Sequence, residues 1–373
     1  MKDFKHFGIK RRIYPDKNYN ALWSNLKTIR FGEGVASQLD PEKSEFYDVS
    51  IANKCVTGKC PFCYVAASPN GKYYDNICDT WKKLMSQYTE KVGFDPEDEV
   101  LTEFFATMFS KKTEPSKMDL AFARTFLSRV DNEFVPKITY TDKPFQIAIG
   151  SEGEPTEHPQ FCVFLKTVYE TNVVPNYTTN GVILSLAGCE EGESVSDLEY
   201  DWSEGEMHSM IARAWELLDY TSKYVGGVAV SYSNKKLHKY ARRAVNALIK
   251  HGNTNINIHH IISDMQSVDD FIKIAEEYGD EIKYHVLLPL MPSGRSKEGM
   301  DPEAFKYLEQ QIIEHKIDNV AFGANFSPYL NDSEIKTWNY PPESLSKNML
   351  LTPDVVKITP SSFNLTPCKL IKV

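Results

Sequence analysis

Short apolar runs alternate with amphipathic stretches along most of this chain of 373 residues. The runs are rich in Val, Ile and aromatic residues and are bounded by Gly, Pro or Asn, which is typical of β-strands. They predict strands over residues 46–51, 145–149, 173–177, 227–230, 256–262, 284–290 and 319–322. Helical periodicity between them predicts helices over residues 77–92, 159–170, 207–224, 235–251, 268–278 and 302–315.

Strands that alternate with helices favour a parallel sheet joined by right-handed crossovers. Residues 286–290 are apolar throughout, as expected for a strand that is buried on both faces. An open sheet satisfies this order, but polar and glycine-rich motifs follow successive strands, and in barrels the chemistry lies at that carboxyl-terminal rim. We therefore predict an α/β fold, a partial (β/α)6-type TIM-like barrel with parallel strands and with N- and C-terminal extensions.

The regular alternation spans residues 46–330, which we predict to be the core barrel. Two stretches are too long for the repeat and are interpreted as insertions, one over about 94–140 and an acidic one over about 185–206. The first contains a predicted helix pair over residues 99–109 and 118–130. Whether the insertions cover the rim or only decorate the surface stays open. Residues 1–45 and 331–373 are predicted to be extensions outside the repeat.

The composition is that of a soluble globular protein, with 42% hydrophobic and 25% charged residues. The first residues lack the apolar run of a signal peptide, and no stretch approaches the roughly 20 apolar residues that cross a bilayer. We therefore expect a cytoplasmic protein with no membrane partner. The net charge of −9 makes a nucleic-acid substrate improbable, and the basic run over residues 235–243 is interpreted as the solvated face of a helix.

Three of the seven cysteines, Cys55, Cys60 and Cys63, lie within nine residues directly after the first predicted strand. Thiolates this close in sequence can converge on one metal centre. The same spacing opens a two-iron ferredoxin, which needs a fourth cysteine, and the nearest one, Cys78, falls in a predicted helix. A structural zinc site is another use of paired cysteines. A disulfide is disfavoured because the cysteine count is odd and the chain is not small.

Polar and glycine-rich motifs follow four of the later strands. They are Gly150 to Pro159 (GSEGEPTEHP), Thr178 to Gly181 (TTNG), Ser231 to Asn234 (SYSN) and Pro289 to Arg295 (PLMPSGR). Exposed backbone amides beside a carboxylate can hold a zwitterionic ligand. Arg295 could pair with a carboxylate of such a ligand or form a structural ion pair. Each motif alone is weak, but four in register with the cysteine triplet point to one site at the rim.

These residues together resemble the radical S-adenosylmethionine (radical SAM) superfamily over about residues 46–330. The signature of that family has three and then two residues between cysteines, with an aromatic residue just before the last. Here Phe62 takes the aromatic place, and the first gap is one residue longer. The family's Gly-Gly-Glu-Pro motif is matched by Gly153-Glu154-Pro155, with Glu152 in place of the first glycine.

The resemblance implies a ligand set for two cofactors. Cys55, Cys60 and Cys63 would ligate three irons of a [4Fe-4S] cluster, and the fourth iron would take the amino and carboxylate groups of S-adenosylmethionine. The resemblance further assigns residues to the bound S-adenosylmethionine: Gly153, Glu154 and Glu152 to its ammonium group, Ser231 or Ser233 to its ribose or carboxylate, Asn180 to a lower position in the pocket, and Phe62 and Tyr64 to the vicinity of its adenine.

The function implied is that of a radical SAM enzyme. An electron from the reduced cluster would cleave S-adenosylmethionine to methionine and a 5′-deoxyadenosyl radical, which abstracts hydrogen from a substrate. The acidic chain favours a peptide or small-molecule substrate, and a flavodoxin or ferredoxin would supply the electron. Two alternatives remain: a non-catalytic iron–sulfur electron carrier or sensor, and a barrel enzyme whose cysteines bind structural zinc.

Overall fold

The structure is a computed structural model that describes residues 9–14, 19–23, 28–32, 44–58, 60–92, 138–188, 204–330, 333, 335, 346–364 and 366–373. All seven predicted strands are present within one sheet. In chain order the strands of this sheet are β4 (Phe46–Ser50), β7 (Gln146–Ile149), β8 (Val174–Thr179), β9 (Val228–Ser231), β10 (Ile256–Ile262), β11 (Tyr284–Pro289), β12 (Val320–Phe322), β13 (Ser346–Leu351), β14 (Val355–Thr359) and β15 (Lys369–Lys372).

The spatial order of the sheet is β12-β11-β10-β9-β8-β7-β4-β13-β14-β15. The strands are parallel from β12 to β13, and β14 and β15 are antiparallel. Seven of these strands are thus consecutive βα units, and the C-terminal strands extend the sheet beside β4. The predicted α/β fold with a partial, largely parallel barrel is confirmed. The division into domains stays a prediction.

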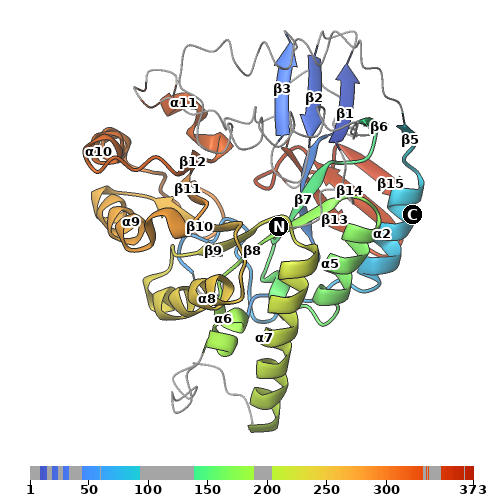
Figure 1. Ribbon diagram of the computed structural model, residues 1–373, viewed down its shortest axis with the longest axis horizontal. Coiled ribbons are helices and arrows are strands. Elements are labelled where there is room, and N and C mark those ends of the chain that lie inside the picture. Colours follow the sequence, from blue (N-terminus) through green and yellow to red (C-terminus); the bar gives the residue numbers. More distant parts are fainter. Residues whose placement is uncertain are drawn as a thin grey trace, which may run out of the picture.

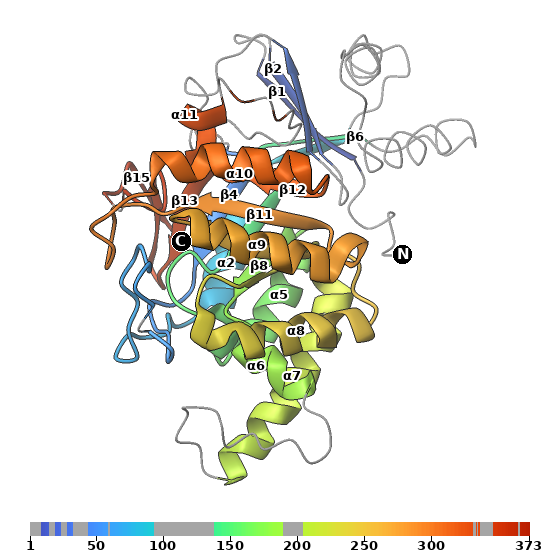
Figure 2. The same ribbon diagram turned by 90° about the vertical axis from the view of Figure 1, so that its left-hand side faces the viewer.

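Helices follow the strands in the predicted order and cover one side of the sheet (Figures 1 and 2). They are α2 (Ile77–Ser86), α5 (Phe161–Glu170), α6 (Val182–Ser185), α7 (Glu204–Tyr224), α8 (His238–Lys250), α9 (Met265–Tyr278), α10 (Pro302–Glu314) and α11 (Ser327–Leu330). Short 3₁₀ turns occur at η4 (Pro155–Glu157), η5 (Leu186–Gly188), η7 (Lys235–Leu237), η8 (Gly279–Glu281) and η9 (Ala324–Phe326). Figure 2 shows α10, α9 and α8 side by side over β11 and its neighbours.

The helix predicted over residues 77–92 is too long. The helix ends at Ser86, and β5 (Glu90–Val92) begins four residues later. Strand β5 pairs with β6 (Ile138–Thr141), so a long-range partner overrides the local helical pattern there. The helix pair predicted over residues 99–109 and 118–130 lies outside the described residues.

Burial alternates along the strands, and one face packs on the helices. On β10, Ile258 and His260 are buried, whereas Asn257 and His259 are only half-buried. The ring of His260 contacts Phe271 of α9, with centroids 5.1 Å apart. The two adjacent histidines thus face opposite sides of the sheet, as neighbours on a strand must. The other face, away from the helices, is less covered and more polar.

A second sheet joins two parts of the chain that the sequence separates. Its order is β3-β2-β1-β6-β5, with β1 (Ile9–Tyr14), β2 (Tyr19–Trp23) and β3 (Thr28–Gly32) from the N-terminal extension. Strands β5 and β6 flank the first predicted insertion, and β6 pairs in parallel with β1. Figure 1 shows β1, β2 and β3, in blue, standing above the large sheet. The extension and the edges of the insertion therefore form one unit.

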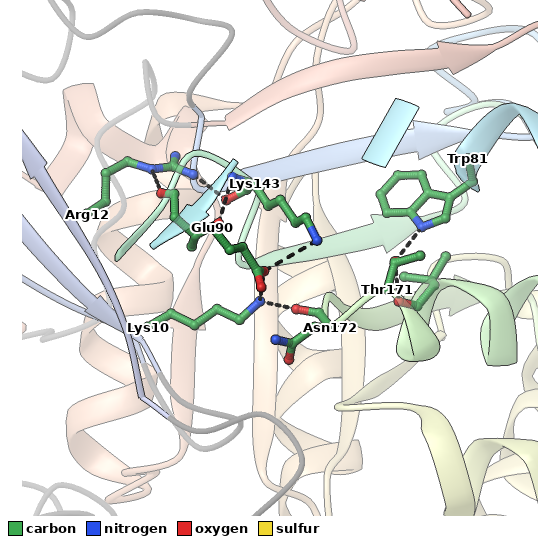
Figure 3. Close-up of polar contacts among 9 residues, drawn as sticks. Lys10, Arg12, Trp81, Glu90, Lys143, Thr171 and Asn172 are labelled. Carbon is green, nitrogen blue, oxygen red and sulfur yellow. Dashed lines mark hydrogen bonds and ion pairs between the residues drawn. The ribbon is translucent and has the colours of Figure 1, made fainter. Parts of the chain in front are cut away.

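The second sheet meets the barrel through charged and polar residues, of which Lys10 and Arg12 are buried. We call this set the N-terminal junction (Lys10, Arg12, Glu90, Lys143 and Asn172; Figure 3). Glu90 lies 3.8 Å from the Lys10 ammonium and 3.4 Å from that of Lys143. Lys10 also donates to the carbonyl of Asn172, and the Arg12 guanidinium donates to the carbonyl of Lys143. Lys143 precedes β7 and Asn172 precedes β8, so this junction lies at the amino ends of the parallel strands.

Candidate metal and cofactor site

The three clustered cysteines lie on one loop at the opposite, carboxyl end of the parallel strands. This cysteine loop (residues 51–76) connects β4 to α2 and closes on itself. The amide of Cys55 donates to the carbonyl of Ser68 at 3.1 Å, and the amide of Tyr74 donates to the carbonyl of Ile51 at 2.9 Å. The three thiols of the triplet are free and half-buried. The loop therefore places three half-buried cysteines at the predicted rim.

Gly153, after β7, packs directly on the backbone of the cysteine loop. Its φ is +87°, and a Cβ placed on it would lie 2.5 Å from the carbonyl oxygen of Lys54. The next amide, that of Glu154, donates to the same oxygen at 2.9 Å. Only glycine permits this approach, because any side chain would meet backbone atoms that cannot move aside. Gly153, which the resemblance assigns to cofactor binding, therefore also packs against the cysteine loop and fixes its position.

Glu154 ties the end of β7 to the end of β8. Its Oε1 accepts hydrogen bonds from the Thr179 hydroxyl at 2.8 Å and from the hydroxyl and amide of Thr156 at 2.7 and 3.2 Å. Its Oε2 accepts from the backbone amide of Asn180 at 2.7 Å. Burial raises the pKa of Glu154, and these hydrogen bonds partly offset that rise. One oxygen is thus saturated, while Oε2 keeps room for a further donor.

The loop after β11 clamps the cysteine loop from the other side. Gly294 has a φ of +62°, and its Cβ would lie 2.2 Å from the carbonyl oxygen of Cys63. The Arg295 amide donates to that carbonyl at 3.1 Å, and its guanidinium donates to the carbonyl of Cys60 at 3.2 Å and to that of Ala67. Arg295 forms no ion pair within the described part of the chain, where it binds backbone carbonyls, so the structural ion pair considered from the sequence is not found. Its pairing with a ligand carboxylate stays a prediction. Backbone carbonyls can accept from a guanidinium as a carboxylate can.

Two side chains contact the cysteine sulfurs, one from the loop after β9 and one from the cysteine loop itself. The Asn234 amide donates to the Sγ of Cys60 at 3.2 Å. The Thr57 hydroxyl lies 3.2 Å from the Sγ of Cys55 and accepts from the side-chain amide of Asn180 at 3.1 Å. Asn180 is assigned to the pocket by the family resemblance, whereas Thr57 and Asn234 are contacts of the sulfurs that the sequence does not predict. The motif Ser231 to Asn234 was the only signal for Asn234.

Burial perturbs the thiols of the cysteine loop. It raises the pKa of Cys55 to about 12, with the nearby Glu154 carboxylate adding to the shift. Burial also raises the pKa of Cys60, which the Asn234 hydrogen bond partly offsets. Both thiols are therefore protonated at neutral pH, and a bound metal centre would have to displace their protons.

The other predicted cofactor residues are near the loop but differ in exposure and contacts. Ser231 and Ser233 lie at the end of β9 with their hydroxyls 3.4 Å apart, and Ser233 accepts from the Ile261 amide at 3.1 Å. Glu152 is buried and accepts from the Tyr74 hydroxyl at 3.1 Å. Burial raises the pKa of Glu152. Ser231, Ser233 and Glu152 therefore lie at the same rim as the cysteine loop. Their assignment to a cofactor stays a prediction.

Phe62 is half-buried on the cysteine loop, and Tyr64 is turned toward the C-terminal segment. The Tyr64 hydroxyl donates to the carbonyl of Ser151, and its ring lies 4.9 Å from that of Phe363, centroid to centroid. A residue far along the chain therefore packs beside the cysteine loop. The assignment of Phe62 and Tyr64 to adenine stays a prediction.

The C-terminal segment contributes a polar network that the sequence did not reveal. Asn348 of β13 accepts a hydrogen bond from the Ser151 hydroxyl at 2.8 Å, and Ser362 donates to Asp48 of β4 at 2.9 Å. Burial raises the pKa of Asp48 to about 6. Because β13 lies beside β4 with Asn348 opposite Asp48, residues about 300 positions apart meet on the less covered face of the sheet.

The donor set suits an iron–sulfur cluster in its chemistry. Thiolates are soft ligands that hold iron–sulfur centres, and the three thiols are half-buried on a loop clamped by Gly153 and Gly294. Within the residues that the structure describes, no three His, Cys, Asp or Glu side chains converge as ligands of a single ion would. A cluster spreads its thiolates over several irons, so it does not need such convergence.

No family model and no curated protein matches the sequence. Among solved structures, SuiB of Streptococcus suis bound to S-adenosylmethionine has a TM-score of 0.52 and 10% identity, covering 96% of this chain and 82% of that one. SuiB bound to its precursor peptide SuiA has a TM-score of 0.46 and 13% identity, covering 88% and 62%. TYW1 with a lysine-pyruvate adduct bound has a TM-score of 0.33 and 12% identity, covering 72% and 70%.

The chain thus has the fold of SuiB, in agreement with the barrel that the family resemblance implied. It spans less than two thirds of the SuiB chain in the peptide complex. No helix among the described residues is both long enough and apolar enough to cross a membrane.

Proposed function

We propose that this chain is a radical SAM enzyme in which Cys55, Cys60 and Cys63 hold a [4Fe-4S] cluster. The observation that carries the proposal is the cysteine loop itself. Its three free, half-buried thiols are clamped by Gly153 and Gly294 at the carboxyl end of a parallel sheet. The fold is that of SuiB, which was crystallised with S-adenosylmethionine. Bound there, such a cluster would supply one-electron chemistry to start a radical reaction from S-adenosylmethionine, with the electron provided by a flavodoxin- or ferredoxin-type carrier.

The residues of this chain would bind and orient the cofactor. Oε2 of Glu154 has a free acceptor position beside the Asn180 amide, which suits the methionine ammonium, and the Gly153 and Glu152 backbone adjoins it. Ser231 and Ser233, at the neighbouring strand end, would take the ribose or carboxylate. Phe62 and Tyr64 would pack near the adenine.

We propose a peptide or small molecule as the substrate, because the net charge of −9 disfavours a nucleic-acid backbone. The free thiols also need a reducing compartment, which supports a cytoplasmic location.

The test is the formation of 5′-deoxyadenosine from S-adenosylmethionine after anaerobic reconstitution with iron and sulfide and reduction with dithionite. We expect the wild type to hold iron and sulfide and to form the product. Cys60→Ala should lose both properties. The matched control is Cys368→Ser, because that thiol is exposed and lies on the C-terminal segment outside the loop.

Three results would contradict the proposal. Zinc without sulfide in the isolated protein would favour the structural zinc site. Equal iron loss in Cys60→Ala and Cys368→Ser would refute the ligand assignment. A cluster that assembles but does not bind S-adenosylmethionine would favour an electron carrier or sensor.

A further inference from the structure

We propose that Asn234 and Thr57 set the reduction potential of the cluster by hydrogen bonding to the sulfurs of Cys60 and Cys55. This inference rests on the proposed function and goes beyond it, because neither residue belongs to the cysteine triplet or to the glycine-rich motif. Hydrogen bonds to the ligating sulfurs are among the factors that set the potential of an iron–sulfur centre. Two such bonds are present in this site.

The Asn234 side chain is held in one orientation by two partners. Its Oδ1 accepts from the Lys236 amide at 3.1 Å, where Asn234 caps η7. A backbone amide can only donate, so the oxygen of the Asn234 side chain must face Lys236 and the NH₂ group must face Cys60. That group donates to the Cys60 Sγ at 3.2 Å. The end of β9 thereby supplies a fixed donor to one sulfur.

A relay from the end of β8 fixes the second donor. The Oδ1 of Asn180 accepts from the Val182 amide at 2.9 Å, which directs the Asn180 NH₂ group to the Thr57 hydroxyl at 3.1 Å. Because Thr57 accepts there, its own proton is free to point at the Cys55 Sγ, 3.2 Å away. A metal-bound thiolate has no proton to give, so this direction is the one compatible with a ligated Cys55.

The contacts of Cys63, the third cysteine, differ from those of Cys55 and Cys60. Its carbonyl accepts from the Arg295 amide at 3.1 Å, and its own amide donates to the Cys60 carbonyl at 3.2 Å. In the described ranges no side chain donates to the Sγ of Cys63. Two of the three irons would thus have ligands with stabilised negative charge. Adding an electron increases the charge on the sulfurs, so the two donors favour the reduced cluster and raise its potential.

Two pairs of variants separate the effect of losing the hydrogen-bond donor from an effect on the local structure. Thr57→Val removes the hydroxyl while keeping the branched shape, and Thr57→Ser keeps the hydroxyl. Asn234→Ser keeps a helix-capping oxygen but is too short to reach Cys60, and Asn234→Asp keeps the cap while replacing the donor by a charged acceptor. Each protein is reconstituted, its iron and sulfide are counted, and the midpoint potential of the cluster is measured by EPR-monitored redox titration with dithionite.

We expect the midpoint to become more negative in Thr57→Val, Asn234→Ser and most of all Asn234→Asp, with full cluster content. Thr57→Ser should match the wild type. The same midpoint in all proteins, with clusters present, would overturn this inference and leave the proposed function standing. Loss of the cluster in Thr57→Val but not in Thr57→Ser would overturn it as well, because the hydroxyl would then serve assembly. A wild type without any cluster would overturn both.

Discussion

The large sheet contacts the cysteine loop at its carboxyl end and the second sheet at its amino end, and the two sets of contacts differ in kind. At the carboxyl end, the cysteine loop is clamped by backbone contacts of Gly153 and Gly294 and by the carbonyl-binding Arg295, which leave the thiols half-buried. At the amino end, the N-terminal junction buries charge, and the Lys10 side chain has no exposed surface (Figure 3). The contacts at the carboxyl end leave the three cysteines partly exposed, whereas those at the amino end remove Lys10 from solvent. The three thiols thus lie at the carboxyl end of the sheet, where the cofactor site is proposed.

The largest expected effect is at the carboxyl end, in Gly153→Ala. The added Cβ would lie 2.5 Å from the Lys54 carbonyl oxygen, so the cysteine loop must shift. We expect loss of most bound iron and a decrease of about 1–3 kcal/mol in the free energy of unfolding. Iron content after reconstitution and urea unfolding measure the two quantities.

Gly252→Ala is the matched control for that variant. Gly252 has a similar φ of +79°, but nothing lies within 4 Å of its added Cβ. Gly252→Ala should lower the free energy of unfolding by about 1 kcal/mol through its backbone conformation alone, and the protein should keep its iron. Equal iron loss in both variants would mean that the close approach of Gly153 to the loop is not what holds the thiols.

The second largest expected effect is a pH dependence of the free energy of unfolding that arises at the N-terminal junction. Burial lowers the pKa of Lys10 from 10.5 to about 7, and Glu90 only partly offsets this. Between about pH 7 and pH 10 the unfolded chain keeps a proton that the folded chain has released. Stability should therefore rise with pH in that window, by up to about 1.4 kcal/mol per pH unit.

Lys10→Met should remove that rise, as measured by urea unfolding at pH 7, 8 and 9. Lys143→Met is the control, because Lys143 lies on the same Glu90 carboxylate but is partly exposed. An unchanged slope in Lys10→Met would show that the buried ammonium does not titrate as its surroundings indicate. Iron content should stay the same in both variants, since the junction lies at the far end of the sheet.

The smallest effect is expected at Asp48. Its pKa is raised to about 6, so between about pH 4 and pH 6 the folded chain keeps a proton that the unfolded chain loses. The ionised carboxylate thus costs stability above pH 6. Asp48→Asn should remove this cost, and its stability advantage should grow by about 1 kcal/mol from pH 5 to pH 7.5.

The control for Asp48→Asn is Asp280→Asn, which changes an exposed carboxylate on η8. Urea unfolding at the two pH values should give the same difference from wild type for Asp280→Asn at both. If Asp48→Asn also shows no pH dependence, the carboxylate is better solvated than its position beside Ser362 indicates.

Local signals were enough for much of the fold. The seven strands and the main helices lie close to their predicted positions, because short runs rich in Val, Ile and aromatic residues between turn-forming residues are a strong local signal for strands. The end of α2 was mispredicted where β5 pairs with a distant strand. The second sheet was missed because its central strand carries Lys10, Arg11 and Arg12, all buried, and their charges hide the strand pattern.

The sequence by itself determined the order of strands and helices, the cysteine triplet and the rim motifs, because these depend on neighbours in the chain. Only the tertiary structure decided what each rim residue contacts. Asn234 reaches Cys60 across 174 positions, and Asn348 meets Ser151 across 197. Nothing in local composition encodes such pairs. The first pair arises because parallel strands bring their carboxyl ends to one edge, where side chains from separate loops meet. The second arises because β13 lies beside β4 in the sheet.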